Sequence, residues 1–259
     1  MHMDRRQFVK NLGLGTASLS MGSLVTASSC APSGDSSLKQ NVKEGEDGQF
    51  LFIGDDIAIA QTEYGKVQGY LLNHVYTFLG VPYGADTSGK NRFMPPQKPE
   101  PWTDVRPAVF YGNTAPQRME NRWPNNYGTF ADHWNYWDVS EDCLYLNVWT
   151  PGIADGKKRP VLVWLHGGGF TNGSGIEQDG YHGENISREG DIVFCSINHR
   201  LGPIGFSDLS GVGGEAYKDS GNVGMLDIIA ALRWVHDNIA NFGGDPGNVT
   251  VMGQSGGCL

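Results

Sequence analysis

The chain has 259 residues, of which 39% are hydrophobic and 18% are charged, a balance that is ordinary for a globular protein with a buried core. Its 28 acidic residues outnumber its 19 basic residues and give a formal net charge of −9. No basic stripe is therefore available to neutralise the phosphates of a nucleic acid, and we expect no nucleic-acid partner. The length suits one large α/β domain or two small domains.

Residues 1–30 have the features of an export signal. Arg5 and Arg6 precede a mildly apolar stretch, residues 11–29, that is rich in Gly, Ser and Ala and is typical of a twin-arginine (Tat) signal peptide. This stretch is too short and too polar for a stable membrane span. The alternative is a disordered tail in which the two arginines have no role. We expect an exported bacterial protein.

Cys30 ends this segment after Ala27-Ser28-Ser29, and small residues before a cysteine resemble a bacterial lipoprotein cleavage site. Lipidation of Cys30 would anchor the protein to a membrane, but Ala27 stands where such sites usually have a bulky aliphatic residue. The alternative is a soluble periplasmic or secreted protein. Residues 31–50 are expected to form a flexible linker in either case, and residues 51–259 belong to the folded domain.

The folded part is predicted to alternate strands with helical and irregular segments. The elements expected in chain order are an antiparallel hairpin over 57–72 that turns at 63–66, a strand over 75–81, a long irregular segment over 84–137, strands over 144–149, 161–165 and 192–197, a helix over 222–241, and a strand over 249–252. The runs 161–165 and 192–197 are continuously apolar, as expected of central strands that are covered on both faces. This order indicates an α/β fold.

The segment Gly253-Gln254-Ser255-Gly256-Gly257 matches the pattern G-x-S-x-G directly after a predicted strand. A nucleophilic serine on a sharp strand-to-helix turn is strained, and side chains two positions to either side would collide. The alternative is an ordinary glycine turn, because the chain contains 37 glycines.

The segment His166-Gly167-Gly168-Gly169-Phe170 follows another predicted strand. Consecutive glycines allow backbone N–H groups to point to one place, where they can stabilise the oxyanion of a tetrahedral intermediate. A phosphate-binding loop would need a following Lys and a helix N-terminus, which this segment lacks. The two glycine segments together indicate acyl transfer at Ser255.

Metal and cofactor binding are not indicated. No group of His, Cys, Asp or Glu has the spacing of metal ligands, so we expect neither a metal nor a cofactor. Cys143, Cys195 and Cys258 are too few and too far apart to form an obvious disulfide framework.

From about residue 57 onward the chain resembles the type-B carboxylesterase (cholinesterase-like) family of α/β-hydrolases. The resemblance rests on the two glycine segments and on five further stretches: Phe78-Leu79-Gly80-Val81-Pro82-Tyr83-Gly84, Arg92-Phe93, Glu141-Asp142-Cys143-Leu144-Tyr145-Leu146-Asn147-Val148-Trp149-Thr150-Pro151, Asn198-His199-Arg200-Leu201-Gly202 and Phe242-Gly243-Gly244-Asp245-Pro246.

The resemblance implies an α/β-hydrolase fold with a mostly parallel central sheet and an N-terminal antiparallel hairpin. It also implies hydrolysis of a small-molecule carboxylic ester through an acyl-enzyme on Ser255, with the N–H groups of Gly168, Gly169 and Gly256 as oxyanion donors. The family's triad carboxylate and His come later in the sequence. We therefore expect the chain to be the N-terminal half of the domain, truncated at the nucleophile elbow and inactive by itself.

Three positions depart from the family pattern. Gly256 replaces the usual Ala but keeps its N–H, and Gln254 replaces a frequent Glu, which makes cationic choline-type substrates less suitable. Cys143 lacks its usual upstream partner and is expected to be a free, buried thiol.

The resemblance also implies two buried structural ion pairs, Arg92 with Glu141 and Arg200 with Asp245.

Aromatic residues cluster just before Glu141: Trp123, Tyr127, Phe130, Trp134, Tyr136 and Trp137. They are expected mainly to anchor a long loop. The alternative is that they form one wall of a substrate gorge, in which Trp134 is the candidate contact.

Two other functions remain open. A catalytically inactive cholinesterase-like binding or adhesion protein would share the fold, but such proteins typically lack the serine or the oxyanion glycines. An α/β-hydrolase that cleaves amides or thioesters would use the same machinery.

Overall fold

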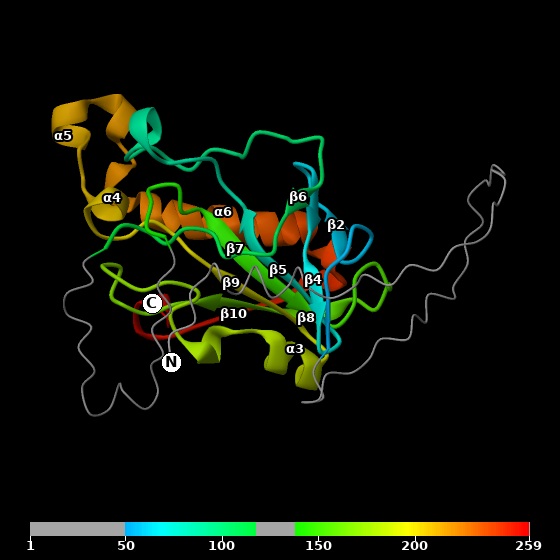
Figure 1. The fold of residues 1–259 in the computed structure, drawn as a ribbon. Helices are drawn as coiled ribbons and strands as arrows, with labels where there is room; N and C mark the ends of the chain where they lie inside the picture. Colours follow the sequence, from blue (N-terminus) through cyan, green and yellow to red (C-terminus); the bar gives the residue numbers. More distant parts are fainter. Residues whose placement is uncertain (1–49, 118–137, 259) are drawn as a thin grey trace, which may run out of the picture. The chain divides into compact units, whose positions relative to one another are not determined.

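A computed structural model of the chain describes residues 50–117 and 138–258 (Figure 1). The predicted export signal, Cys30, the linker up to residue 49, and Trp134 with its aromatic neighbours lie outside the described residues, so those expectations stay predictions.

A seven-stranded mixed sheet forms the centre of the described part. Its strands, in spatial order, are β1 (Leu51–Phe52), β4 (Tyr70–Leu72), β5 (Val75–Pro82), β7 (Tyr145–Thr150), β9 (Val193–Ile197), β8 (Arg159–Leu165) and β10 (Gly244–Gly253). Pairing is antiparallel from β1 to β9 and parallel across β9, β8 and β10. The predicted α/β-hydrolase architecture is confirmed, and the parallel pairing includes β8 and β10, the two strands that lead into the two glycine segments.

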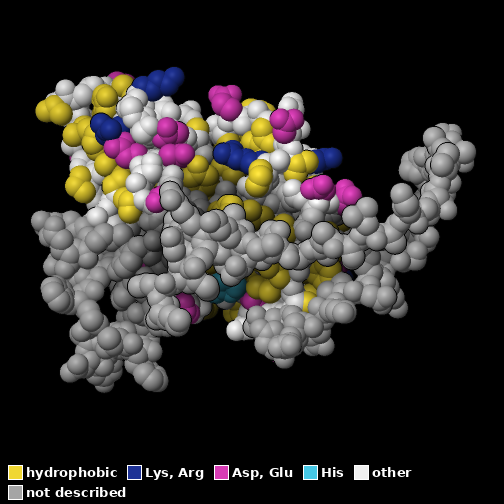
Figure 2. All heavy atoms as spheres, in the orientation of Figure 1, with side chains coloured by type: hydrophobic (Ala, Val, Ile, Leu, Met, Phe, Trp, Pro, Cys, Tyr) yellow, Lys and Arg dark blue, Asp and Glu magenta, His cyan; other side chains and the backbone are white. Residues whose placement is uncertain are grey.

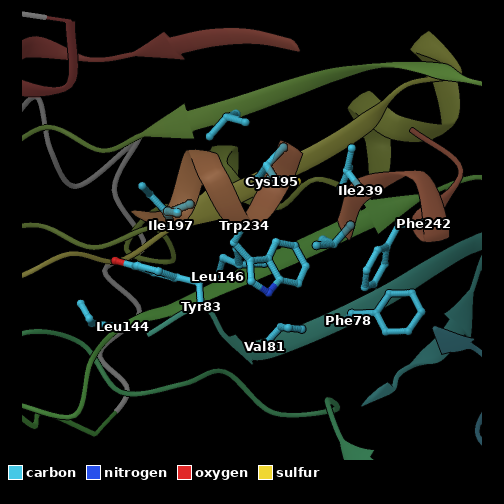
Figure 3. Packing of buried hydrophobic residues seen from close by; sticks show 14 of the residues in the cluster. Phe78, Val81, Tyr83, Leu144, Leu146, Cys195, Ile197, Trp234, Ile239 and Phe242 are labelled. Atoms are coloured by element: carbon cyan, nitrogen blue, oxygen red, sulfur yellow. The ribbon is translucent and has the colours of Figure 1, made fainter. Parts of the chain in front are cut away.

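The central strands are buried on both faces because their side chains alternate between two cores. Val161, Val163 and Leu165 of β8 point into the larger core, whereas Leu162 and Trp164 pack against the smaller one. The helix α6 (Val223–Asn238) covers the larger core, in which the rings of Phe78 and Phe242 meet edge to face at 4.9 Å (Figure 3).

The smaller core lies on the opposite face of the sheet, under the short helix α3 (Glu184–Gly190) (Figure 1). Its centre is Trp149, which is fully buried against Phe194. The Ser187 hydroxyl of α3 donates a hydrogen bond of 3.1 Å to the Trp149 carbonyl oxygen, which ties the helix to β7.

The predicted hairpin over 57–72 divides between two sheets. Its turn at 63–66 is confirmed, because β2 (Ile59–Gln61) and β3 (Lys66–Gln68) pair antiparallel across it. These strands form a separate three-stranded sheet with β6 (Arg106–Pro107), while Tyr70–Leu72 crosses into the central sheet as β4. Gly69 permits the close crossing, because a Cβ there would lie 2.0 Å from the Thr77 carbonyl oxygen.

The remaining elements are short. They are α4 (Gly202–Phe206), α5 (Ser210–Gly213) and the 3₁₀ turns η1 (Gly89–Asn91), η2 (Asp179–Tyr181), η3 (Glu215–Tyr217), η4 (Ser220–Asn222), η5 (Ile239–Phe242) and η6 (Ser255–Cys258). No helix among the described residues is both long and apolar enough to cross a membrane.

The predicted partner of Arg200 is wrong. Arg200 is buried and forms a bidentate ion pair with Asp227 of α6, through bonds of 2.7 and 2.8 Å. Asp245 instead accepts a hydrogen bond from the Gly247 N–H at the start of β10. The reason is the rotation of α6, which places Asp227 on its buried face, whereas the apolar Ile229 is 42% exposed.

The second predicted ion pair forms but is not buried. The Arg92 guanidinium lies 2.8 Å from the Glu141 carboxylate, with side chains 47% and 22% exposed. Cys143 is a free, buried thiol as predicted, and burial raises its pKa well above the usual thiol value.

Charged side chains of both signs are interspersed with apolar ones over the described face of the molecule in Figure 2. Where the described side chains are visible on that face, no single sign of charge forms a continuous strip.

Candidate functional site

The two glycine segments lie side by side because the strands that lead into them end together. In the parallel pair β8–β10, Trp164 is opposite Met252 and Leu165 is opposite Gly253. The Gln254 N–H then donates to the Leu165 carbonyl oxygen at 3.2 Å, which extends the pairing by one residue. The loop from His166 and the turn from Gln254 therefore begin at the same edge of the sheet, where catalytic residues of α/β folds are expected.

Ser255 has the strained geometry expected of a nucleophile elbow. Its φ is +50°, in the left-handed region that a residue with a side chain rarely adopts. The flanking glycines are required by close backbone contacts: a Cβ on Gly253 would lie 2.3 Å from the Gly257 carbonyl oxygen, and a Cβ on Gly257 would lie 2.2 Å from that of Leu165. The sharp turn leaves the Ser255 side chain exposed.

The loop after β8 also uses conformations that favour glycine. Gly168 and Gly169 have φ values of +105° and +58°, and a Cβ on Gly168 would lie 2.0 Å from the Asn172 carbonyl oxygen. The Gly168 carbonyl oxygen accepts hydrogen bonds from the N–H groups of Thr171 and Asn172, which closes a tight turn. This turn fixes the direction of the neighbouring peptide groups.

The loop and the elbow are in contact. The point where a Cβ on Gly256 would lie is 3.1 Å from the Gly169 nitrogen, and the corresponding point on Gly167 is 3.5 Å from the Ser255 Cβ. Within 50–117 and 138–258, no group accepts a hydrogen bond from the N–H of Gly168, Gly169 or Gly256. The structure thus brings Gly169 against Gly256, and Gly167 against Ser255.

The histidines near the loop have structural contacts. His166 Nδ1–H donates to the Gly167 carbonyl oxygen at 2.8 Å, and its ring stacks on His199 at 4.8 Å. Burial lowers the pKa of His199 to about 4, so this ring is neutral at pH 7. Among the described residues, no histidine or carboxylate is hydrogen-bonded to the Ser255 hydroxyl.

One residue beside the site has no marker in the sequence pattern. The Tyr181 hydroxyl donates a hydrogen bond of 2.6 Å to Gln254 Oε1, next to Ser255. The two residues are 73 positions apart, and Tyr181 belongs to a short 3₁₀ turn without amphipathic periodicity. Only the tertiary structure reveals this contact.

In the part of the chain that the structure describes, no group of three or more His, Cys, Asp or Glu side chains is arranged to hold a metal ion. The functional groups at the site are a serine hydroxyl, backbone N–H groups and a side-chain amide. These groups suit nucleophilic acyl transfer, in which a hydroxyl attacks a carbonyl carbon and N–H groups stabilise the resulting oxyanion.

Residues 56–259 match the model of the carboxylesterase family. The chain is 46% identical over 199 residues to phenmedipham hydrolase of Pseudarthrobacter oxydans, an alignment that covers 77% of this chain and 38% of that protein. It is 44% identical over 202 residues to para-nitrobenzyl esterase of Bacillus subtilis (strain 168), with the same coverage of 77% and 38%. The chain thus spans well under half the length of these relatives.

Solved structures give the same assignment. An esterase from Clostridium hathewayi, described as able to hydrolyse aliphatic aromatic polyesters, superimposes with a TM-score of 0.74 at 43% identity, over 81% of this chain and 40% of that one. The carboxylesterase EST55 of Geobacillus stearothermophilus superimposes with a TM-score of 0.67 at 42% identity, over 76% and 37% of the two chains. With the elbow and the glycine loop in the positions described above, the chain belongs to the carboxylesterase family.

Proposed function

We propose that the protein is a serine carboxylesterase that cleaves small-molecule esters through an acyl-enzyme on Ser255. The observation that carries the proposal is the left-handed, exposed Ser255 in contact with the glycine loop. In this mechanism Ser255 Oγ attacks the ester carbonyl carbon while a general base accepts its proton. The C–O bond to the alcohol then breaks, the alcohol leaves with that proton, and water releases the acid from Ser255.

The N–H groups of Gly168, Gly169 and Gly256 are proposed to bind the oxyanion of the tetrahedral intermediate. Their support is the approach of Gly256 to the Gly169 nitrogen and the absence of another acceptor for these groups among the described residues. Each such donor typically contributes about 10²–10³ in rate. Replacement of Gly256 by Ala keeps the N–H, so this residue is proposed to act through its backbone alone.

The test uses the full-length gene product and a fluorophosphonate probe. We expect the probe to label Ser255, as located by mass spectrometry of the peptide, and Ser255→Ala to abolish both labelling and p-nitrophenyl acetate hydrolysis. Turnover that survives Ser255→Ala would refute the mechanism. A folded protein that neither reacts with the probe nor hydrolyses any ester would instead support the inactive binding protein.

The general base is proposed to be a histidine outside the described residues, oriented by a carboxylate. No described histidine reaches the Ser255 hydroxyl, and His166 and His199 are engaged with backbone carbonyl groups. In the family pattern this histidine and carboxylate come later in the sequence than Ser255, so we expect the 259-residue polypeptide alone to be inactive on p-nitrophenyl acetate. Activity of this polypeptide that is lost in Ser255→Ala would show that its own residues supply the base.

Neutral esters are the proposed substrates. Gln254 puts an uncharged amide beside Ser255, where a carboxylate would attract a cationic alcohol group. The relatives include para-nitrobenzyl esterase and phenmedipham hydrolase, so p-nitrobenzyl esters and phenmedipham are suitable first substrates. A higher kcat/KM for choline esters than for neutral esters of the same acid would contradict this proposal.

Export of the protein is also proposed, on the basis of Arg5-Arg6 and Cys30. We expect Arg5→Lys with Arg6→Lys to retain the protein in the cytoplasm when it is expressed in a bacterium with a Tat pathway. Cys30→Ala should release a lipid-anchored protein from the membrane fraction. An unchanged distribution after Cys30→Ala would indicate a soluble exported protein.

A further inference from the structure

We propose that Tyr181 is a positioning residue that fixes the Ser255 turn relative to the glycine loop. The inference rests on the proposed esterase function and adds a residue to it. Tyr181 comes from the turn η2, which belongs to neither of the two strands that build the site. It contacts the ends of both.

The ring of Tyr181 contacts β8. It lies 4.8 Å from the Trp164 ring, and the Tyr181 side chain is only 5% exposed. Trp164 precedes His166 by two residues, so this contact is made just where β8 ends and the glycine loop begins. Packing between two large rings fixes the position of the Tyr181 hydroxyl relative to β8.

The hydroxyl of Tyr181 contacts the elbow that follows β10. It donates a hydrogen bond of 2.6 Å to Gln254 Oε1. Gln254 lies against the glycine loop, because the point where a Cβ on Gly167 would lie is 3.2 Å from the Gln254 carbonyl oxygen and 3.5 Å from Oε1. The amide of Gln254 is thus held between the Tyr181 hydroxyl and the first glycine of the loop.

The hydrogen bond from Tyr181 affects Ser255 because the Gln254 amide belongs to the residue directly before it. Gln254 and Ser255 share a peptide group, and Ser255 has a left-handed conformation that persists only when its surroundings enforce it. Without the hydroxyl, the Gln254 side chain loses the partner that holds its amide against the glycine loop. We expect the Ser255 Oγ to lose its alignment with the N–H groups of Gly168 and Gly169, which lowers the rate of acylation more than the affinity for the ester.

The first experiment compares Tyr181→Phe with the matched control Tyr145→Phe in the full-length gene product. Phe keeps the ring on Trp164 and removes only the hydroxyl. Tyr145 also donates its hydroxyl to a side chain, Asp142 Oδ2 at 2.8 Å, but at the start of β7. We expect Tyr181→Phe to lower kcat and the rate of fluorophosphonate labelling about threefold to thirtyfold, with KM little changed, and Tyr145→Phe to lower neither.

The second experiment uses pH as a readout that a purely structural role would not change. In Gln254→Glu the Tyr181 hydroxyl would donate to a carboxylate, which stabilises the charged form and lowers the pKa of the new group. In a plot of kcat/KM against pH, the titration of this carboxyl group adds a new limb. Addition of Tyr181→Phe removes the hydrogen bond and should therefore move this limb to higher pH. If Tyr181→Phe alone does not fold, Gln254→Met removes the acceptor and should show the same loss of kcat.

The outcomes separate the two proposals. Loss of turnover in Ser255→Ala together with wild-type kcat and labelling in Tyr181→Phe would overturn the role of Tyr181 and leave the esterase mechanism intact. A limb in Gln254→Glu that does not move with Tyr181→Phe would also overturn it. Turnover that is independent of Ser255 would refute the esterase mechanism and, with it, the positioning role.

Discussion

Gly257→Ala tests whether steric contact at the elbow, and not backbone conformation, makes the last glycine of the G-x-S-x-G segment necessary. The φ of Gly257 is not in the left-handed region, so Ala itself is not strained there. The added Cβ would lie 2.2 Å from the Leu165 carbonyl oxygen and 2.9 Å from that of His166. Both oxygens belong to the backbone that leads into the glycine loop.

The expected magnitude follows from the shift that the methyl group forces. Carbon and oxygen in close contact lie about 3.3–3.6 Å apart, so the two backbone segments must separate by about 1 Å. A misplacement of about 1 Å in an active site can reduce the rate about 10²-fold. Overpacking of this kind also destabilises a protein by about 1–3 kcal/mol.

Gly256→Ala is the matched control one residue earlier. Its Cβ would lie 3.1 Å from the Gly169 nitrogen and 3.2 Å from the Gly169 Cα, contacts that a displacement of a few tenths of an ångström relieves. We expect kcat/KM for p-nitrophenyl acetate to fall about 10²-fold in Gly257→Ala and less than about tenfold in Gly256→Ala. Equal kcat/KM values and equal Tm values for the two variants would refute the steric argument.

Two further predictions concern the buried charges and the buried histidine. Asp227→Asn leaves the Arg200 guanidinium uncompensated in the core and should lower the free energy of unfolding by about 3–5 kcal/mol in urea titrations. Arg92→Ala breaks a solvent-accessible ion pair and should lower the free energy of unfolding far less. Similar losses for the two variants would contradict this. The pKa of His199 is lowered to about 4, so the unfolded chain binds a proton first, and up to about 3 kcal/mol of stability present above pH 6.5 is lost as the pH falls toward 4. His199→Gln should flatten this pH dependence in urea titrations and the exposed His236→Gln should not; equal slopes in all three proteins would exclude His199 as the source.

Short-range sequence patterns were sufficient to predict that the two glycine segments lie together at one edge of the sheet. Both glycine segments follow apolar runs, and parallel strands in an α/β fold present their carboxyl ends at one edge of the sheet. The pattern around Ser255 also implied its strained turn, because glycines are needed where backbone oxygens crowd a Cβ. These inferences depend on neighbours within a few residues, which the sequence displays directly.

Partners that are distant along the chain were not predictable in the same way. Asp227 is four residues from Val223 and four from Ala231, both fully buried, so it occupies the buried stripe of α6. A carboxylate in that stripe is a signal of a buried partner, although the apolar Ile229 on the same helix is 42% exposed. The contact between Tyr181 and Gln254 has no such signal, because neither residue belongs to a periodic segment.

The register of β10 on β8 is the feature on which the whole site depends. The pairing shifts between Gly244 and Val249, so the irregular start of β10 determines which residue finally lies opposite Leu165. A slip of one residue would move the elbow along the strand by about 3.3 Å and turn its side chains to the other face of the sheet. Ser255 would then lie away from Gly169. Contacts that link the two strand ends, such as the ring of Tyr181 on Trp164 and its hydroxyl on Gln254, hold this register at the place where the chemistry requires it.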